Sequence, residues 1–466
     1  MFGTVTIPVW LFVLILLFAA VTLASHFLFP SVRWFFRKRM ERVVARINTR
    51  LQRPIEPFKL ARRHDMIQRL IYDPEVTREI VAYAREHDVP ENVGFEKARD
   101  YAREIVPSFS ATAYFSIGMR FARWLSTSLY HVRLGDFEQA ALDRIDDRAA
   151  VVFVMNHRSN MDYVLVTHLV SRASAMSYAV GEWARVWPLS SIIRAMGAYF
   201  IRRRNRGGLY RRVLARYVQM ATVGGVTQAF FPEGGLSLTG RIAAPKLGIL
   251  SYVAGDTAEL GRDVIFVPVA VNYDRVLEDK FLVAADKSGV RRFRPPIWTI
   301  LSDLGRHLFR RVTWRFRKFG TASVGFGTPL SLAAWHAQTG DGTVEALAAE
   351  LMGRVGAVVP VLPVPLVARA LIGGAADRAA VQVAVAAMLD TLAGTGAPLP
   401  RRDAATVTQD ALALLAMRKL VVEEAGGIGV AQGAGDLIAF YAASIAHHFD
   451  DARAPRARKL KGRAQH

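Results

Sequence analysis

The stretch AVVFVMNHRSNMDY, residues 150–163, is the one from which the fold is predicted. It opens with a continuous apolar, β-branched run, which is typical of a strand buried on both faces. Polar residues follow at once, and a helical pattern begins at about Met161. His157 and Asp162 therefore stand in the turn between a strand and a helix. An Asp that holds one imidazole nitrogen leaves the other nitrogen as a base; an Asp in such a turn can equally serve as a helix cap.

On the C-terminal side of this stretch, strand-like and helix-like segments alternate. The expected strands are 199–201, 226–231, 264–271 and 322–326, and the expected helices between them are 209–222 and 246–259. Strands that alternate with helices predict an α/β fold with a central, mostly parallel sheet flanked by helices.

Polar residues also follow three of the other expected strands. The segment GAYFIRRR (197–204) places Arg202 and Arg203 where guanidinium groups could hold a phosphate, unless they form a solvated charge run. In FFPEGGLSLTGR (230–241) a pair of glycines exposes backbone N–H groups that suit an anion, or forms a plain turn. The segment VPVAVNYD (267–274) is a buried strand that ends in polar groups.

The order and spacing of these four segments are specific when taken together. The chain resembles the glycerolipid acyltransferase superfamily, whose four blocks read H-x4-D, G-x-x-F-I-R-R, F-P-E-G and V-P-V. The form HRSNMDY, with IRR, PEGG and YDRVLE at 273–278, is more similar to the glycerol-3-phosphate and dihydroxyacetone-phosphate acyltransferase branch than to the lysophosphatidate branch. The resemblance covers residues 130–330.

The resemblance implies a reaction. His157 would take the proton of an acceptor hydroxyl, and Asp162 would orient it. The oxygen would then attack the thioester of acyl-CoA or acyl-carrier protein directly, which suits a chain without Cys. No metal and no cofactor beyond the acyl carrier are implied. The other positions that match the family, or lie beside its blocks, are Arg202 and Arg203 for phosphate, Glu233, Gly234 and Ser237 for the acceptor, and Pro268 in the block that shapes the site.

The third block departs from the family pattern. Leu236 and Leu238 stand where the family often has arginines, and a hydrogen bond from an arginine to phosphate contributes about 1.5–3 kcal/mol. We expect other cations to compensate, namely Arg158, Arg204, Arg241 or Lys246. Glycerol 3-phosphate is the predicted acceptor, with lysophosphatidate and dihydroxyacetone phosphate as alternatives.

Charge and hydropathy narrow the choice of partners. Lys and Arg number 61 against 40 Asp and Glu, which leaves a net charge of +21 and favours nucleic acid, anionic lipid or phosphorylated substrates. Residues 5–29 contain no charged side chain, and about 20 apolar residues suffice to cross a bilayer. A basic, aromatic segment follows. These features predict a single N-terminal pass in the cell inner membrane with the catalytic domain on the cytoplasmic face, rather than a signal peptide. Nucleic acid is then the less favoured partner.

The expected organisation has five parts: an anchor (1–32), a helical region (33–130), the acyltransferase domain (131–330), a helical C-terminal region (331–450) and a basic tail (451–466). Helices are expected at 376–394, 403–424 and 434–447. The segment 109–132 reads as an amphipathic helix at a membrane surface or in the core, and 291–319 is rich in Arg and aromatic residues. The alternative from another class is a non-catalytic membrane protein that binds anionic lipid or nucleic acid.

Overall fold

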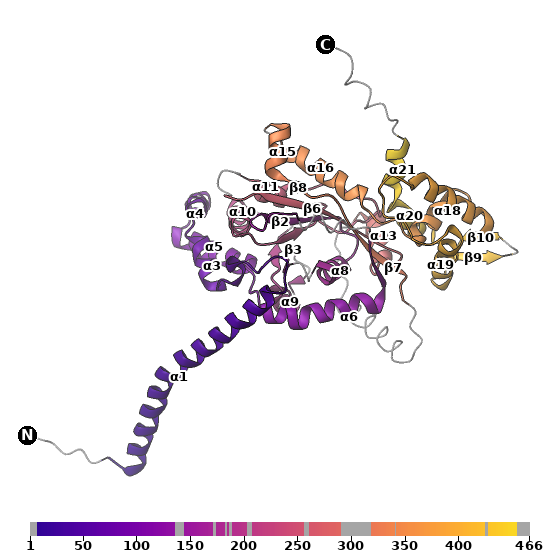
Figure 1. Ribbon diagram of the computed structural model, residues 1–466. Helices are drawn as coiled ribbons and strands as arrows, with labels where there is room; N and C mark the ends of the chain where they lie inside the picture. The colour runs from indigo at the N-terminus through magenta and orange to yellow at the C-terminus, as the bar shows by residue number, and fades with distance from the viewer. Residues whose placement is uncertain are drawn as a thin grey trace, which may run out of the picture. The chain divides into compact units, whose positions relative to one another are not determined.

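The computed structural model describes residues 7–135, 144–170, 174–181, 184–185, 189–202, 207–255, 261–289, 318–340, 342–424 and 427–453. The chain divides into two compact units, Met1–Ile55 and Glu56–His466. The first unit holds one long helix, α1 (Val9–Asn48) (Figure 1). In the described part of the chain, no helix has both the length and the apolar character needed to cross a membrane. The domain boundaries expected at 130 and 330 both fall inside the second unit and stay a prediction.

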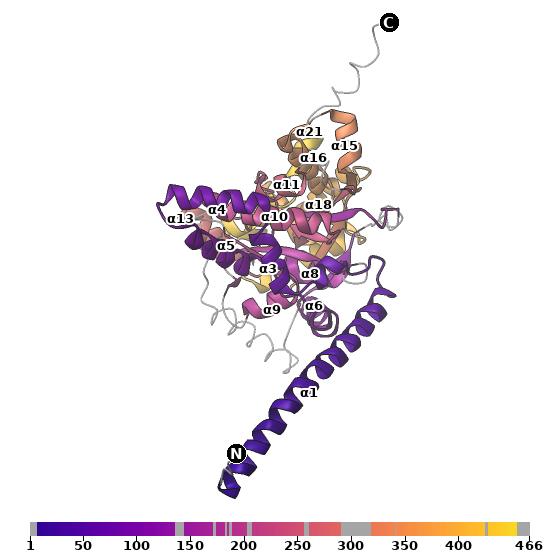
Figure 2. The same cartoon turned by 90° about the vertical axis from the view of Figure 1, so that its left-hand side faces the viewer.

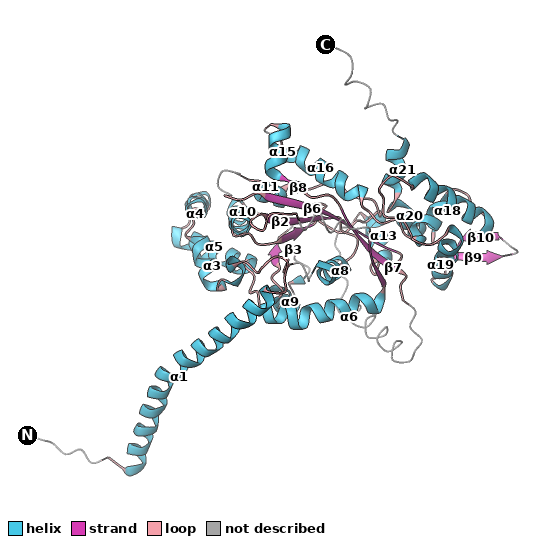
Figure 3. Ribbon diagram, in the orientation of Figure 1, coloured by secondary structure: helices cyan, strands magenta, loops and turns pink. Residues whose placement is uncertain are grey.

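A mixed sheet forms the centre of the second unit (Figure 3). Its strand order is β1-β7-β6-β2-β5-β3-β4, with β8 paired to β6. All pairs are parallel except those that β6 makes with β7 and β8. The prediction of a mostly parallel α/β sheet is therefore confirmed, although three short strands, β1, β3 and β8, were not expected. The strands are β1 (His131–Leu134), β2 (Ala150–Met155), β3 (Ser177–Gly181), β4 (Tyr199–Ile201), β5 (Gln228–Phe230), β6 (Val264–Tyr273), β7 (Thr321–Phe326) and β8 (Leu330–Ser331).

Strand β2 is buried along its whole length because helices cover both faces of the sheet. Val151 and Phe153 point into one hydrophobic core, and Val152 and Val154 point into the other. This alternation is the period-2 geometry of a strand. It explains why residues 150–155 have to be apolar without interruption.

The two layers of helices come from different parts of the chain. Helices of the N-terminal region pack with α10 and α16 on one face, where Figure 2 shows α3, α4, α5 and α10 together. The C-terminal helices pack with α6 and α8 on the other face. The first layer contains α3 (Arg63–Ile71), α4 (Pro74–Glu86), α5 (Glu91–Ile105), α10 (Gly208–Val223), α11 (Gly248–Val253), α15 (Leu332–Thr339) and α16 (Val344–Ala357). The second contains α6 (Met119–Leu129), α8 (Met161–Val170), α13 (Asp279–Ser288), α17 (Pro363–Ile372), α18 (Arg378–Leu392), α19 (Ala404–Met417) and α20 (Gly435–Ala443).

The prediction of a helix at 403–424 is wrong for its last residues. Helix α19 ends at Met417, and Lys419 takes the left-handed backbone conformation with φ of 57°. Two antiparallel strands follow, β9 (Val421–Glu424) and β10 (Gly427–Val430). Because β-branched residues favour strands, the Val pair that opens β9 explains why the helix does not continue.

Pro268 lies within the long strand β6, opposite Val154 of β2. A proline cannot donate to a sheet ladder. On its other side β6 pairs with β8 up to Phe266 and with β7 from Val269, so Pro268 falls at the break between the two pairings. Its carbonyl accepts from the N–H of Gly327 at 2.8 Å. The position where Pro268 lacks an N–H group thus lies where β6 is paired with neither β7 nor β8, so no ladder hydrogen bond is lost there. The described contacts of Pro268 hold the sheet together.

Candidate active site

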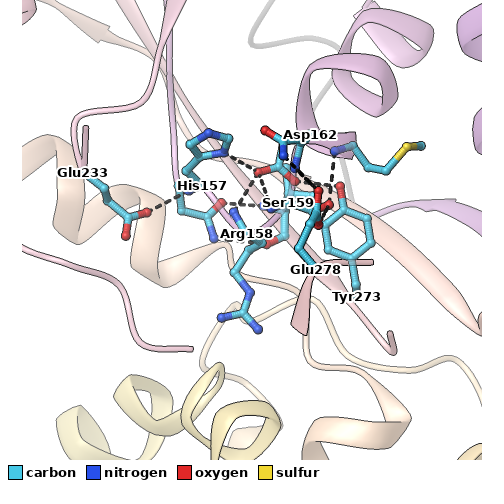
Figure 4. Close-up of polar contacts among 11 residues, drawn as sticks. His157, Arg158, Ser159, Asp162, Glu233, Tyr273 and Glu278 are labelled. Atoms are coloured by element: carbon cyan, nitrogen blue, oxygen red, sulfur yellow. Dashed lines mark hydrogen bonds and ion pairs between the residues drawn. The ribbon is translucent and has the colours of Figure 1, made fainter. Parts of the chain in front are cut away.

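His157 and Asp162 form a buried hydrogen-bonded pair at the carboxyl end of β2 (Figure 4). The distance from Nδ1 of His157 to Oδ2 of Asp162 is 2.9 Å, and the two side chains are 2% and 0% exposed. A carboxylate can only accept, so Nδ1 carries the proton. The lone pair of the neutral imidazole is then on Nε2, the nitrogen that a general base would use.

The carboxylate of Asp162 is held by donors on both oxygens. Oδ2 also accepts from the backbone N–H groups of Arg158 at 2.7 Å and Ser159 at 3.0 Å. Oδ1 accepts from the hydroxyl of Tyr273, at the end of β6, at 2.7 Å. These contacts fix the carboxylate in one orientation, and through it the plane of the imidazole.

The third block, residues 230–241, forms hydrogen bonds with the main chain of His157. The N–H of His157 donates to Oε1 of Glu233 at 2.8 Å, and Oε2 of Glu233 accepts from the N–H of Ala243 at 2.9 Å. The N–H of Ser237 donates to the carbonyl of His157 at 2.9 Å. Burial raises the pKa of Glu233 to about 7, against the opposing effect of these two N–H donors. The imidazole itself stacks on Phe231 with ring centroids 3.9 Å apart.

Three residues that support this centre were not predicted. The Asn156 amide bridges β2 to β6, donating to the carbonyl of Val271 and accepting from its N–H. Glu278 accepts from the hydroxyl of Ser159 at 2.7 Å and from Asn160, and burial raises its pKa. Tyr273 is the third. The sequence does contain a signal for Tyr273 and Glu278, because both belong to YDRVLE (273–278). This segment lies at the end of β6, the strand next to β2, and so reaches the same edge of the sheet.

The predicted phosphate ligand Arg158 lies deep in the protein. One of its nitrogens donates to the carbonyl of Gly240, and its guanidinium stacks 4.9 Å from the ring centroid of Phe440 on α20. Its Nε and Nη2 have no hydrogen-bond partner among the described residues. Figure 4 shows the side chain pointing away from the imidazole. Arg241 is 61% exposed at the surface and pairs with Asp450 at 3.5 Å.

Lys246 and Gly234 are brought together beside Glu233. The N–H of Lys246 donates to the carbonyl of Pro232 at 2.8 Å, and its Nζ lies 3.2 Å from the position that a Cβ on Gly234 would take. Gly234 has φ of +67°, which favours glycine. Leu236 and Leu238, the two departures from the family pattern, pack against the hydrophobic core of the C-terminal layer.

Arg202 lies elsewhere on the same edge. It follows β4, three strands from β2, and forms a two-pronged ion pair with Glu104 at 2.6 and 2.9 Å. Arg203 lies outside the described residues. Among the residues that the structure describes, no group of three His, Cys, Asp or Glu side chains could hold a metal ion.

A histidine oriented by a buried carboxylate, at the carboxyl edge of a mostly parallel sheet, defines a class: α/β proteins with a buried His–Asp pair at that edge. Comparison with known families agrees with this class and is more specific. Residues 137–272 match the family model described as acyltransferase. Residues 306–451 match the model described as glycerol-3-phosphate acyltransferase C-terminal region. Together these two matches support the glycerolipid acyltransferase superfamily and, within it, the glycerol-3-phosphate acyltransferase branch.

Curated relatives carry the same description. The chain is 29% identical over 301 residues to a glycerol-3-phosphate acyltransferase of Shewanella loihica, and 30% identical over 298 residues to that of Shewanella woodyi. These matches cover 63% and 62% of this chain, and 35% of each relative, so the chain spans about a third of their length. A solved structure of the 1-acyl-sn-glycerophosphate acyltransferase from Thermotoga maritima matches with a TM-score of 0.31 and 20% identity, over 51% of this chain and 73% of that one.

Proposed function

We propose that this protein is a glycerol-3-phosphate O-acyltransferase, which transfers a fatty acyl group from an acyl thioester to glycerol 3-phosphate and releases lysophosphatidate. The observation that carries the proposal is the His157–Asp162 pair, held at 2.9 Å and fixed by backbone donors. The family models and the descriptions of the Shewanella relatives support the choice of acceptor.

The reaction follows from the orientation of the imidazole. Nε2 of His157 takes the proton of the acceptor hydroxyl, and the ionised Asp162 stabilises the imidazolium that forms. The hydroxyl oxygen attacks the thioester carbonyl carbon, and a new C–O bond forms. When the tetrahedral intermediate collapses, the C–S bond breaks, and the thiolate takes the proton back from the imidazolium. The products are the oxygen ester and the free thiol.

Lys246 is our candidate for the acceptor phosphate. Its ammonium lies beside Gly234, one residue from the Glu233 that holds the main chain of His157. An ammonium binds phosphate as a point charge. Lys246 therefore supplies the positive charge for the phosphate that Leu236 and Leu238 cannot supply. The glycine matters because a side chain there would push into Lys246.

A panel of acceptors tests this function. Purified protein is incubated with labelled palmitoyl-CoA and, separately, with glycerol 3-phosphate, dihydroxyacetone phosphate and lysophosphatidate. We expect free CoA and labelled lysophosphatidate from glycerol 3-phosphate. Product from lysophosphatidate alone would move the enzyme to the second acylation step. The absence of product from every acceptor, with acyl-carrier protein as the second donor, would reject acyl transfer.

We also propose that the chain works at a membrane, because its product is a lipid. In α1 the consecutive residues Phe12 to Phe18 are all exposed and apolar, so no side of these turns is polar. Such a helix suits a lipid environment. On α6 and the π-helix before it (Ala113–Gly118), Ile117, Phe121 and Trp124 are exposed at a spacing that places them on one face. Arg120 and Arg123, also exposed, suit anionic headgroups.

Vesicle flotation tests the α6 face. We expect the full chain to float with phosphatidylglycerol vesicles, and the double variant Phe121→Ser, Trp124→Ser to float less. Tyr72→Ser, which removes an exposed ring elsewhere, serves as the matched control. Equal flotation of the double variant and the control would remove the α6 face from membrane contact.

A further inference from the structure

A cavity of about 640 Å³ opens beside α3, α5 and α9 (Leu189–Ala195), away from His157. Two carboxylates, Asp100 and Glu104, contribute to its lining. The arginines among its described lining residues are Arg63, Arg103, Arg185, Arg194 and Arg202. Positive groups therefore outnumber carboxylates in the described wall of the cavity.

One buried carboxylate holds two of these arginines. Glu104, with a side chain that is 5% exposed, accepts from Arg185 at 2.8 Å and from Arg202 at 2.6 and 2.9 Å. Its single negative charge is thus shared between two guanidinium groups. The carboxylate of Glu104 therefore orders both arginines but can neutralise only one of their two positive charges.

Among the described residues, neither Arg63 nor Arg194 forms an ion pair with a carboxylate within 4.0 Å. Arg63 donates to the backbone carbonyls of Val106, at 3.0 Å, and Arg103. Arg194 lies over the ring of Phe200, 5.2 Å from its centroid, and its buried Nε has no hydrogen-bond partner in the described part of the chain. Burial first, and then Arg194 and Arg103, lower the pKa of Arg63. Burial first, and then Arg185, lower the pKa of Arg194, where the nearby Glu104 acts in the opposite direction. Arginines nevertheless stay protonated, so their mutual repulsion favours a bound anion.

We propose that this cavity, which we call the arginine cavity, binds the phosphate groups of a CoA thioester donor. The inference rests on the proposed acyl transfer. Guanidinium forks match phosphate oxygens. A volume of 640 Å³ exceeds what one phosphate group requires and is typical of a small-molecule site.

The position of the cavity suits a donor that reaches His157 from the side. Arg202 follows β4 and His157 follows β2, at the same edge of the sheet. Three strand spacings of about 4.8 Å separate them, roughly 14 Å in all. In acyl-CoA the extended pantetheine arm connects the nucleotide to the thioester and spans such a gap. Glycerol 3-phosphate, whose phosphate lies only a few bonds from its hydroxyl, cannot reach both places.

Binding of adenosine 3′,5′-bisphosphate, measured by calorimetry on the full-length protein, tests the site without turnover. We expect binding that weakens as salt rises. We expect the double variant Arg185→Ala, Arg194→Ala to bind about tenfold to a hundredfold more weakly. Glu104 keeps Arg202 as a partner in this variant. Arg85→Ala, an exposed arginine of α4 outside the cavity, is the matched control, and a thermal melt checks that each variant is folded. Unchanged binding in a folded double variant would overturn the proposal.

Kinetics distinguish the possible sources of the phosphate. The double variant should raise the KM for palmitoyl-CoA by the same factor, with kcat and the KM for glycerol 3-phosphate unchanged. A rise in the KM for glycerol 3-phosphate alone would assign the cavity to the acceptor, and a rise for acyl-carrier protein alone would assign it to that donor; either result overturns the proposal. If no acceptor yields product, but the double variant still binds adenosine 3′,5′-bisphosphate more weakly than the wild type, the proposed acyl transfer is rejected. The arginine cavity is then still a phosphate-binding site.

Discussion

The centre around His157 and the arginine cavity share one edge of the sheet, but they differ in how their charges are satisfied. Every carboxylate oxygen of Asp162 and Glu233 accepts a hydrogen bond of 3.0 Å or less. In the arginine cavity, Arg63 and Arg194 form no ion pair with a carboxylate among the described residues, and the buried Glu104 pairs with two other arginines. The first region is preorganised for chemistry at one atom. The second is left with positive charge that a ligand can satisfy.

The largest effect is expected at the base. His157→Ala should lower kcat by 10²–10⁴-fold, because it removes the group that accepts the proton. Neither KM should change greatly, since the phosphate-binding side chains stay in place. The matched control is His87→Ala, on an exposed turn after α4. Full activity in His157→Ala would reject the proposed chemistry.

The second-largest effect is expected at Glu233, which accepts a hydrogen bond from the main chain of His157. Glu233→Gln should lower kcat roughly tenfold to a hundredfold, because an amide cannot accept from both the His157 and Ala243 N–H groups. Steady-state kinetics with saturating substrates measure the loss. A variant as active as the wild type would mean that the third block does not position the base.

A smaller effect is expected from the hydroxyl of Tyr273. Tyr273→Phe keeps the ring but removes the donor to Oδ1 of Asp162. Because the carboxylate, and with it the imidazole, is then held less firmly in the productive orientation, kcat should fall about tenfold. The less solvated carboxylate then stabilises the imidazolium more strongly, so the acid limb of the kcat/KM profile should move to higher pH. A fall in kcat without a shift of that limb would assign Tyr273 a structural role only.

The last effect is on stability rather than on rate. The pKa of Glu233 is raised to about 7 in the folded protein, from 4.5. The folded state therefore binds more protons than the unfolded state between these values, and its stability falls as pH rises from about 4.5 to about 7. Denaturant unfolding of wild type and Glu233→Gln at several pH values measures this. The difference between the two proteins should have a slope of at most about 1.4 kcal/mol per pH unit, and a flat difference would contradict the assignment.

The contrast between the two regions also marks what could be predicted from the sequence. His157 and Asp162 were predictable because they are five residues apart across one turn after a recognisable buried strand. Tyr273 and Glu278 lie 111 and 119 residues from their partners in this turn, and only the strand order brings them there. The pairing of Arg202 with Glu104, 98 residues earlier on a helix, depends on how the N-terminal helices cover the sheet. Local pattern carries no information about such contacts.

The division of labour between the two regions is tested most directly by full kinetics on two proteins in one assay, with palmitoyl-CoA and glycerol 3-phosphate both varied. His157→Ala should lose kcat while both KM values stay near those of the wild type. The variant Arg185→Ala, Arg194→Ala should keep kcat and raise the KM for palmitoyl-CoA alone. If both variants change the same parameter, the two regions are not separate, and the account of chemistry at one and donor recognition at the other is wrong.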